Sequence, residues 1–188
     1  MNSKGETARQ SYIAARNEIL LRMKLRDQML LFYLAAIGTL LGIALGTSNS
    51  PEILLVIPLI ALGTSIIVSQ HNVVMAVLGQ FCAEELGRFF KNLDPSENSP
   101  QWDNSKTYKS FSANSTNLRS LSHITIILVP SFLALMINWK HINSPFPLNL
   151  IWYIGVACFI FSFVIILKSH TARSNFFQNR DWSGESTY

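Results

Sequence analysis

The sequence predicts an all-α integral membrane protein with four transmembrane helices arranged as two hairpins. Three observations predict this fold: four long apolar stretches, a one-sided distribution of Lys and Arg, and few charged residues. Of the 188 residues, 49% are hydrophobic and 14% are charged, whereas a soluble domain has about 25% charged residues. A soluble helical bundle is the alternative, but four such stretches in so short a chain would leave too little polar surface to cover them.

The apolar stretches contain no Asp, Glu, Lys or Arg and are 16 to 20 residues long; they cover residues 29–46, 53–69, 124–139 and 148–167. A helix needs about 20 apolar residues to cross a bilayer, and the flanking residues have a helical pattern that extends each stretch. The first stretch begins after residue 28 and ends in Gly-Thr-Ser-Asn-Ser-Pro. We therefore interpret it as a transmembrane helix that the mature protein keeps, not as a cleaved signal peptide.

The basic residues predict the orientation. Fourteen of the fifteen Lys and Arg lie in the N-terminal arm, the central connection or the C-terminal tail, and only Lys140 lies in a loop on the other side. Because basic residues mark the cytoplasmic side, we expect both termini in the cytoplasm and the chain in a bacterial inner membrane.

The chain is expected to divide into five parts. The run from Glu6 to Ile37 has no Gly or Pro, so the arm should continue as one helix into the first span. The helix of the second span should likewise continue into the cytoplasm as a stalk, followed by a partly disordered linker over residues 92–120. The parts are a basic arm (1–28), a transmembrane hairpin (29–69), a cytoplasmic helical stalk and flexible loop (70–120), a second hairpin (121–168) and a tail (169–188).

The basic arm has two interpretations. Its cations could lie against anionic lipid headgroups, where each contributes about 1 kcal/mol, or they could bind a cytosolic protein. The residues concerned are Arg9, Arg16, Arg22, Lys24 and Arg26.

The first span contains Gly38, Gly42 and Gly46 at four-residue spacing. This spacing places three small residues on one helix face and predicts close helix packing, within one subunit or between subunits of a homo-oligomer. Glycine is also simply commoner in membrane helices.

Two prolines predict helix kinks. Pro58 should remove a hydrogen bond to Leu54, and Pro130 should free the Ile126 carbonyl, which Ser131 or Thr125 could satisfy. A helix start is expected at Ser50, with Pro51 at its first position and Glu52 in its first turn.

No Asp, Glu, Lys or Arg lies within a span, which argues against coupled transport. The common enzyme motifs are absent from the sequence. Cys82 and Cys158 fall in different environments and are not expected to pair. We expect no enzyme activity, no cofactor, no bound metal and no nucleic-acid partner.

Three histidines, His71, His123 and His170, fall at the cytoplasmic ends of spans two, three and four. They could titrate together or bind a metal in an oligomer, or they could share a depth only because the interface suits a half-polar ring. His141, in the outer loop, is expected to have no notable neighbour. Hydroxyl side chains within the spans should hydrogen-bond across helices or line a narrow pore; they are Thr39, Thr64, Ser65, Thr125, Ser131 and Ser162.

The segment Arg-Asn-Glu-Ile-Leu-Leu-Arg at 16–22, with Lys24, Arg26 and the glycine-spaced span, resembles the opening of a broad group of small bacterial membrane proteins. Ile57-Pro58-Leu59 and His71-Asn72 are similar to their second helix, so the resemblance covers residues 13–90. It implies a membrane component of an anti-phage or stress-response system, in which a cytosolic sensor acts through a membrane partner, and it assigns no functional residues.

The leading functional hypothesis is a non-enzymatic, oligomeric inner-membrane component. It would recruit a cytosolic partner or perturb the lipid bilayer. The alternatives are a small ion channel and a membrane enzyme acting on lipid, for which the three interfacial histidines would be the acid–base groups.

Overall fold

The computed structural model describes residues 3–46, 50–93 and 106–178, and all regular secondary structure in these ranges is helical, as the sequence predicts. The long helices are α1 (Ser3–Leu45), α2 (Ile57–Gln80), α4 (Lys106–Ile137) and α5 (Leu148–Gln178). Shorter elements are two 3-10 helices, η1 (Pro51–Val56) and η4 (Trp139–Asn143), the π-helix η2 (Phe81–Leu86) and the helix α3 (Gly87–Leu93).

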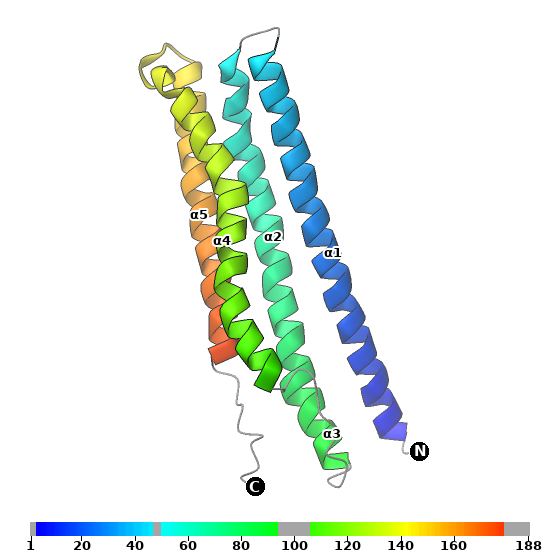
Figure 1. Cartoon of the computed structure of the whole chain (residues 1–188). Coiled ribbons are helices and arrows are strands. Elements are labelled where there is room, and N and C mark those ends of the chain that lie inside the picture. Colours follow the sequence, from blue (N-terminus) through cyan, green and yellow to red (C-terminus); the bar gives the residue numbers. More distant parts are fainter. Residues whose placement is uncertain (1–2, 47–49, 94–105, 179–188) are drawn as a thin grey trace.

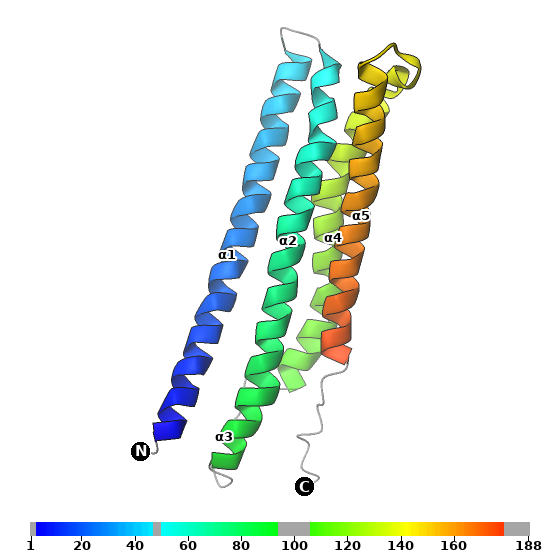
Figure 2. The same cartoon turned by 180° about the vertical axis from the view of Figure 1, so that it is seen from behind.

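The four long helices run alternately up and down, so that helices consecutive in the sequence are antiparallel (Figures 1 and 2). We call the end that holds η1 and η4 the turn end, and the opposite end, where the N-terminus and α3 lie, the arm end. Helix α2 packs against all three other long helices, whereas α1 packs chiefly against α2. Helix α1 is therefore the outermost member of the bundle.

Within the described residues, three helices are long and apolar enough to cross a membrane: Lys4–Leu45, Pro51–Leu93 and Leu148–Ala172. The apolar part of α4, Leu121–Ile137, is shorter. These lengths and compositions are those of a membrane protein.

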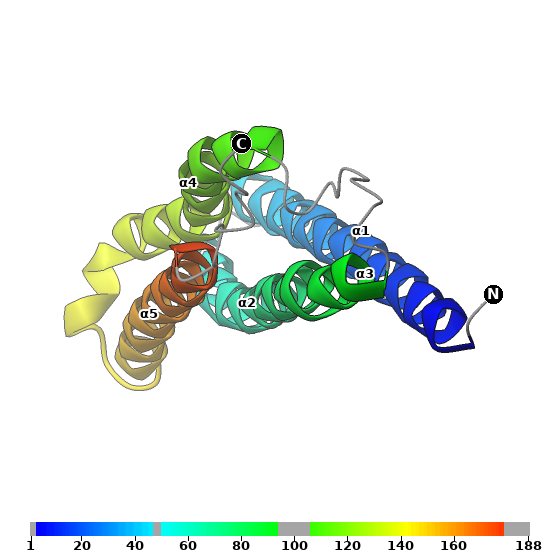
Figure 3. The same cartoon turned by 90° about the horizontal axis from the view of Figure 1, so that it is seen from below.

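Two of these helices are much longer than a bilayer requires. Helix α1 has 43 residues and is therefore about 65 Å long, roughly twice the ~30 Å thickness of a hydrocarbon core. It joins the arm and the first apolar stretch without a break, as predicted. Helix α2 continues through η2 into α3, so the predicted stalk is also helical. The N-terminal part of α1 and α3 lie together on one side, away from α5 (Figure 3).

Buried side chains near the middle of the bundle connect the two hairpins. Tyr33 is 2% exposed, and its hydroxyl donates a hydrogen bond of 2.8 Å to the carbonyl of Ile127 on α4. Ser131, next to Pro130, donates to the same carbonyl at 3.1 Å. Ser131 or Thr125 was expected to satisfy the Ile126 carbonyl; Ser131 instead bonds the carbonyl four residues back, as hydroxyls in helices commonly do.

Pro58 does not interrupt an α-helix. It lies in the first turn of α2, directly after the 3-10 helix η1, where a missing N–H costs little. The expected kink is thus a change from 3-10 to α geometry. Ser50, Pro51 and Glu52 stand at the start of η1 as predicted, although the Ser50 side chain makes no capping hydrogen bond.

The expected linker over residues 92–120 is wrong in its second half, because α4 begins at Lys106. Propensity favours a linker in this Ser- and Asn-rich segment, but the segment is continuous with the apolar part of α4, which extends the helix. Residues 94–105 lie outside the described residues, as do residues 179–188 of the expected tail.

Candidate functional site

A cleft at the arm end lies between α1 and the stalk. Its volume is about 480 Å³. The arm contributes Lys4, Thr7, Ala8 and Ser11, and the stalk contributes Phe81, Glu85, Leu86 and Phe89. The lining combines aromatic and aliphatic surface with one cation and one carboxylate, a mixture typical of sites that bind a side chain or a small amphiphilic molecule.

The stalk side of the cleft is built by the π-helix η2. A π-helix fits one more residue into each turn than an α-helix, is rare, and often occurs at functional sites. Within and after η2, Cys82, Ala83, Leu86 and Gly87 are buried, whereas Glu85 is exposed and Phe89 is 36% exposed. The segment with the wider turn thus buries several side chains in the bundle and also exposes the apolar Phe89 side chain to the cleft.

Aromatic contacts also hold the arm against the stalk. The rings of Tyr12 and Phe90 meet edge to face, with centroids 6.4 Å apart, and Phe89 meets Phe90 at 6.2 Å. The guanidinium carbon of Arg16 lies 6.0 Å from the centroid of the Tyr12 ring, at the limit of a cation–π contact. The arm is therefore half of a packed helix pair, not a helix lying alone on a surface.

The five predicted contact cations have different surroundings. Arg22 forms an ion pair of 2.6 Å with Glu18, and Arg26 forms one of 2.7 Å with Asp27. The Arg26 side chain is only 7% exposed, and its Nη1 donates to Asn72 Oδ1 of α2 at 3.3 Å. Arg16 lies over Tyr12, whereas Arg9 and Lys24 are exposed. Three of the five thus make contacts inside the chain, and of these the sequence indicates only the Glu18–Arg22 pair, through its four-residue spacing.

The three predicted histidines lie on α2, α4 and α5; His123 is buried, and His71 and His170 are half-buried. Among the residues that the structure describes, no three His, Cys, Asp or Glu side chains form a group that could hold a metal ion. The three histidines are therefore not assembled as a metal site within one chain.

The glycines of the first span do not pack within the chain. A Cβ added to Gly38 or Gly42 would meet nothing within 4 Å, and one added to Gly46 would lie 2.7 Å from the Gly42 carbonyl oxygen. The close helix contact is made at Gly155 instead, where a Cβ would lie 3.0 Å from Leu135 and 3.6 Å from Pro58. Packing within one subunit and packing between subunits were both predicted for this face of α1. Gly38 and Gly42 do not pack within the chain, so for them packing between subunits stays a prediction.

Ser169 of α5 donates across to the Ser69 carbonyl of α2 at 3.5 Å, but five of the six predicted hydroxyls bond within their own helix. Each donates to the carbonyl four residues earlier in its own helix, at 2.7 to 3.1 Å; they are Thr39, Thr64, Ser65, Ser131 and Ser162. This local bond is always within reach in a helix.

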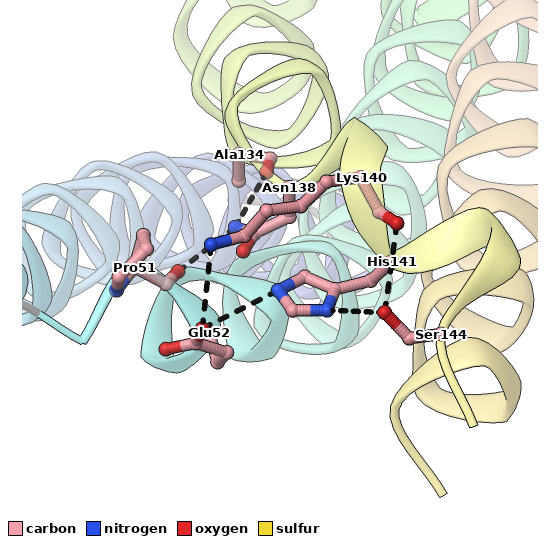
Figure 4. A network of polar contacts seen from close by, with 7 residues as sticks. All are labelled: Pro51, Glu52, Ala134, Asn138, Lys140, His141 and Ser144. Carbon is pink, nitrogen blue, oxygen red and sulfur yellow. Dashed lines mark hydrogen bonds and ion pairs between the residues drawn. The ribbon is translucent and has the colours of Figure 1, made fainter. Parts of the chain in front are cut away.

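A polar network joins the two hairpins at the turn end (Figure 4). Asn138 Nδ2 donates to the Pro51 carbonyl at 2.8 Å. Glu52 Oε1 lies 3.4 Å from His141 Nε2 and 3.8 Å from Lys140 Nζ, and His141 Nδ1 lies 3.0 Å from Ser144 Oγ. The expectation that His141 has no notable neighbour is therefore wrong, because η1 carries Glu52 to it from a distant part of the sequence.

The Glu52 carboxylate responds to this environment. A hydrogen bond from its own backbone N–H and the nearby charges of Lys140 and His141 hold the pKa of Glu52 below its usual value. Its side chain is 35% exposed, so water screens these charges. Glu52 is therefore ionised throughout the pH range in which a histidine titrates.

Comparison with protein-family models, with curated proteins and with solved structures finds no match to this chain. The resemblance to small bacterial membrane proteins stays an expectation.

Proposed function

We propose that this chain is a non-enzymatic, oligomeric component of a bacterial inner membrane that recruits a cytosolic protein through the arm–stalk cleft. The observation that carries the proposal is the cleft itself, which two helices build well beyond their apolar stretches at 29–46 and 53–69. A chain needs such projecting helices only if something meets them there.

The depth of the cleft favours a protein over lipid as its occupant. Ala8 lies 20 residues before the first apolar stretch, which is about 30 Å along a helix. The headgroup layer adds only about 5–8 Å to each side of the hydrocarbon core. The pairing of Arg22 and Arg26 with Glu18 and Asp27 further reduces the charge that the arm offers to anionic lipid.

Connectivity supports four spans with both termini in the cytoplasm. If α2 and α5 both cross the bilayer, α4 must cross as well, because it starts at the arm end and reaches the turn end, where α5 begins. Its apolar part is about 25 Å long, and the flanking turns supply the remainder. The basic residues of the arm and stalk then lie on the cytoplasmic side.

The open face of α1 supports an oligomer. Ile13, Leu20, Leu31, Gly38 and Gly42 lie within about 40° of one another around the helix at 3.6 residues per turn, and all are exposed. Leu20 is 63% exposed and lies on the arm side of the apolar stretch, where lipid tails do not cover it. A second copy of α1 in the same orientation would cover this face along its whole length.

A photocrosslinking residue at Ser11, on the rim of the cleft, tests recruitment in intact cells. The matched control is the same residue at Ala14, which is also small, exposed and on the arm, but does not line the cleft. We expect a cytosolic protein to be trapped from position 11 and not from position 14. Equal trapping, or adducts with lipid alone from both positions, would sink the proposal.

The π-helix offers a second test. Deleting one of the adjacent residues Glu84 and Glu85 removes the extra residue that a π-turn requires, so the turn should close to α-helical geometry. The lining that Phe81, Glu85 and Leu86 give the cleft would then change, so trapping at position 11 should fall. The control, Glu84→Ala, removes one carboxylate without changing the register and should keep trapping.

A further inference from the structure

The polar network at the turn end contains a buried titratable group that the proposed recruitment does not use. His141 is 5% exposed, and its Nε2 has no hydrogen-bond partner among the residues that the structure describes, although Glu52 Oε1 lies 3.4 Å away. A buried ring nitrogen beside a carboxylate gains a charged partner when it takes up a proton.

We propose that His141 and Glu52 form a proton-controlled latch between the turn ends of the two hairpins. Glu52 belongs to η1, which precedes α2, and His141 belongs to η4, which joins α4 to α5. With neutral His141, the hairpins share at this end the Asn138–Pro51 hydrogen bond and the Lys140–Glu52 contact. Protonation adds an ion pair between η1 and η4 and closes the joint further.

The charged groups near His141 are Glu52 from η1 and Lys140 from η4. The apolar stretches of α4 and α5 at this end carry no Asp, Glu, Lys or Arg, and Tyr153 is exposed and meets Trp152 edge to face. The lowered pKa of Glu52 keeps its carboxylate charged, so a proton that enters this group of side chains goes to the imidazole.

Hydrogen exchange of the purified full chain in detergent micelles tests the latch. Two 3-10 hydrogen bonds report on the joint: His141 N–H to the Asn138 carbonyl at 3.0 Å, and Ile53 N–H to the Ser50 carbonyl at 3.3 Å. Each variant is compared with the wild type at the same pH, so that the intrinsic pH dependence of exchange cancels. The variants are His141→Gln, Glu52→Gln and Lys140→Gln.

At pH 5.5 we expect residues 139–144 and 51–56 to exchange about two- to fivefold faster in His141→Gln than in the wild type, the range for a partly exposed ion pair. At pH 8 this ratio should be close to one. The exchange rate of Glu52→Gln relative to the wild type should likewise rise as pH falls. The relative exchange rate of Lys140→Gln should not change with pH.

A ratio for His141→Gln that is the same at both pH values would overturn the latch, as would slower exchange than the wild type at pH 5.5. If His141→Gln unfolds, seen as faster exchange throughout α2, Glu52→Gln decides alone, because it keeps the His141 ring in place. None of these outcomes depends on partner recruitment at the opposite end of the molecule. The proposed topology decides only which compartment's pH the latch would sense.

Discussion

The hydroxyl of Tyr33 donates a 2.8 Å hydrogen bond to the carbonyl of Ile127 and so ties α1 to α4 at the centre of the bundle. These residues are 94 positions apart in the sequence. The accepting carbonyl lies three residues before Pro130, next to the Ile126 carbonyl whose helical donor the proline removes. Because α1 otherwise packs chiefly against α2, this bond is its main polar tie to the second hairpin.

Tyr33→Phe removes the bond and keeps the packing of the ring. We expect a loss of about 0.5–1.5 kcal/mol in the free energy of unfolding, the range for a hydrogen bond inside a membrane protein. Unfolding in mixed micelles measures it. The control, Tyr153→Phe, alters an exposed tyrosine and should have a smaller effect; equal losses would contradict the assignment.

Gly155 and Gly42 make a matched pair for helix packing. Leucine at position 155 must displace Leu135 and Pro58, so Gly155→Leu should destabilise the fold by about 1–3 kcal/mol, as overpacking does. Leucine at position 42 has open space within the chain. Gly42→Leu should therefore leave the unfolding free energy of the isolated chain unchanged and reduce its native mass in detergent, if a second copy packs on α1.

A normal native mass for Gly42→Leu would exclude the glycine face as the subunit contact. Unchanged stability for Gly155→Leu would show that α5 can move away from α2 and α4 without cost.

The features that sequence reasoning predicted are local ones. An uninterrupted run without Gly or Pro predicts that the arm and first span form one helix, and α1 confirms it. The same reasoning predicts the helical stalk and the helix start at Ser50 to Glu52. Each of these depends on residues within a few turns of one another, so periodicity and propensity carry the information.

The features that it missed depend on contacts between distant segments. The π-turn at Phe81–Leu86 has no sequence signature, because one extra residue within a helical run leaves the local propensity unchanged. The contact between Glu52 and His141 can be predicted only if the positions of the two hairpins along the bundle axis are known. Arg26 was expected to face lipid or a partner, but it lies buried against Asn72 of α2. Charge counting alone does not separate a buried cation from an exposed one.

Arg26 can be tested against Arg22, because both pair with a carboxylate on α1 but only Arg26 also reaches α2. Lysine lacks the planar fork that lets the Arg26 guanidinium bond Asp27 and Asn72 together. Arg26→Lys should lower the unfolding free energy by about 1 kcal/mol through the lost buried bond. Arg22→Lys keeps a surface ion pair at four-residue spacing and should cost about 0.3–0.5 kcal/mol or less. Thermal unfolding of the two variants side by side decides; similar shifts would mean that Asn72 contributes nothing.

The lowered pKa of Glu52 predicts that the contact between η1 and η4 at the turn end stabilises the fold less in acid. A carboxyl whose pKa is lower in the folded chain stabilises the fold above its unfolded pKa, and this contribution is lost as pH falls through the folded pKa. The melting temperature of the wild type should therefore exceed that of Glu52→Gln at pH 6, and the two should converge as pH falls below about 4, the ordinary range for a glutamate. Glu85→Gln, at the arm end, is the control for the loss of a carboxylate away from this joint. A gap between wild type and Glu52→Gln that keeps the same size as pH falls from 6 to below about 4 would mean that Glu52 acts through the shape of its side chain and not through its attraction for Lys140 and His141.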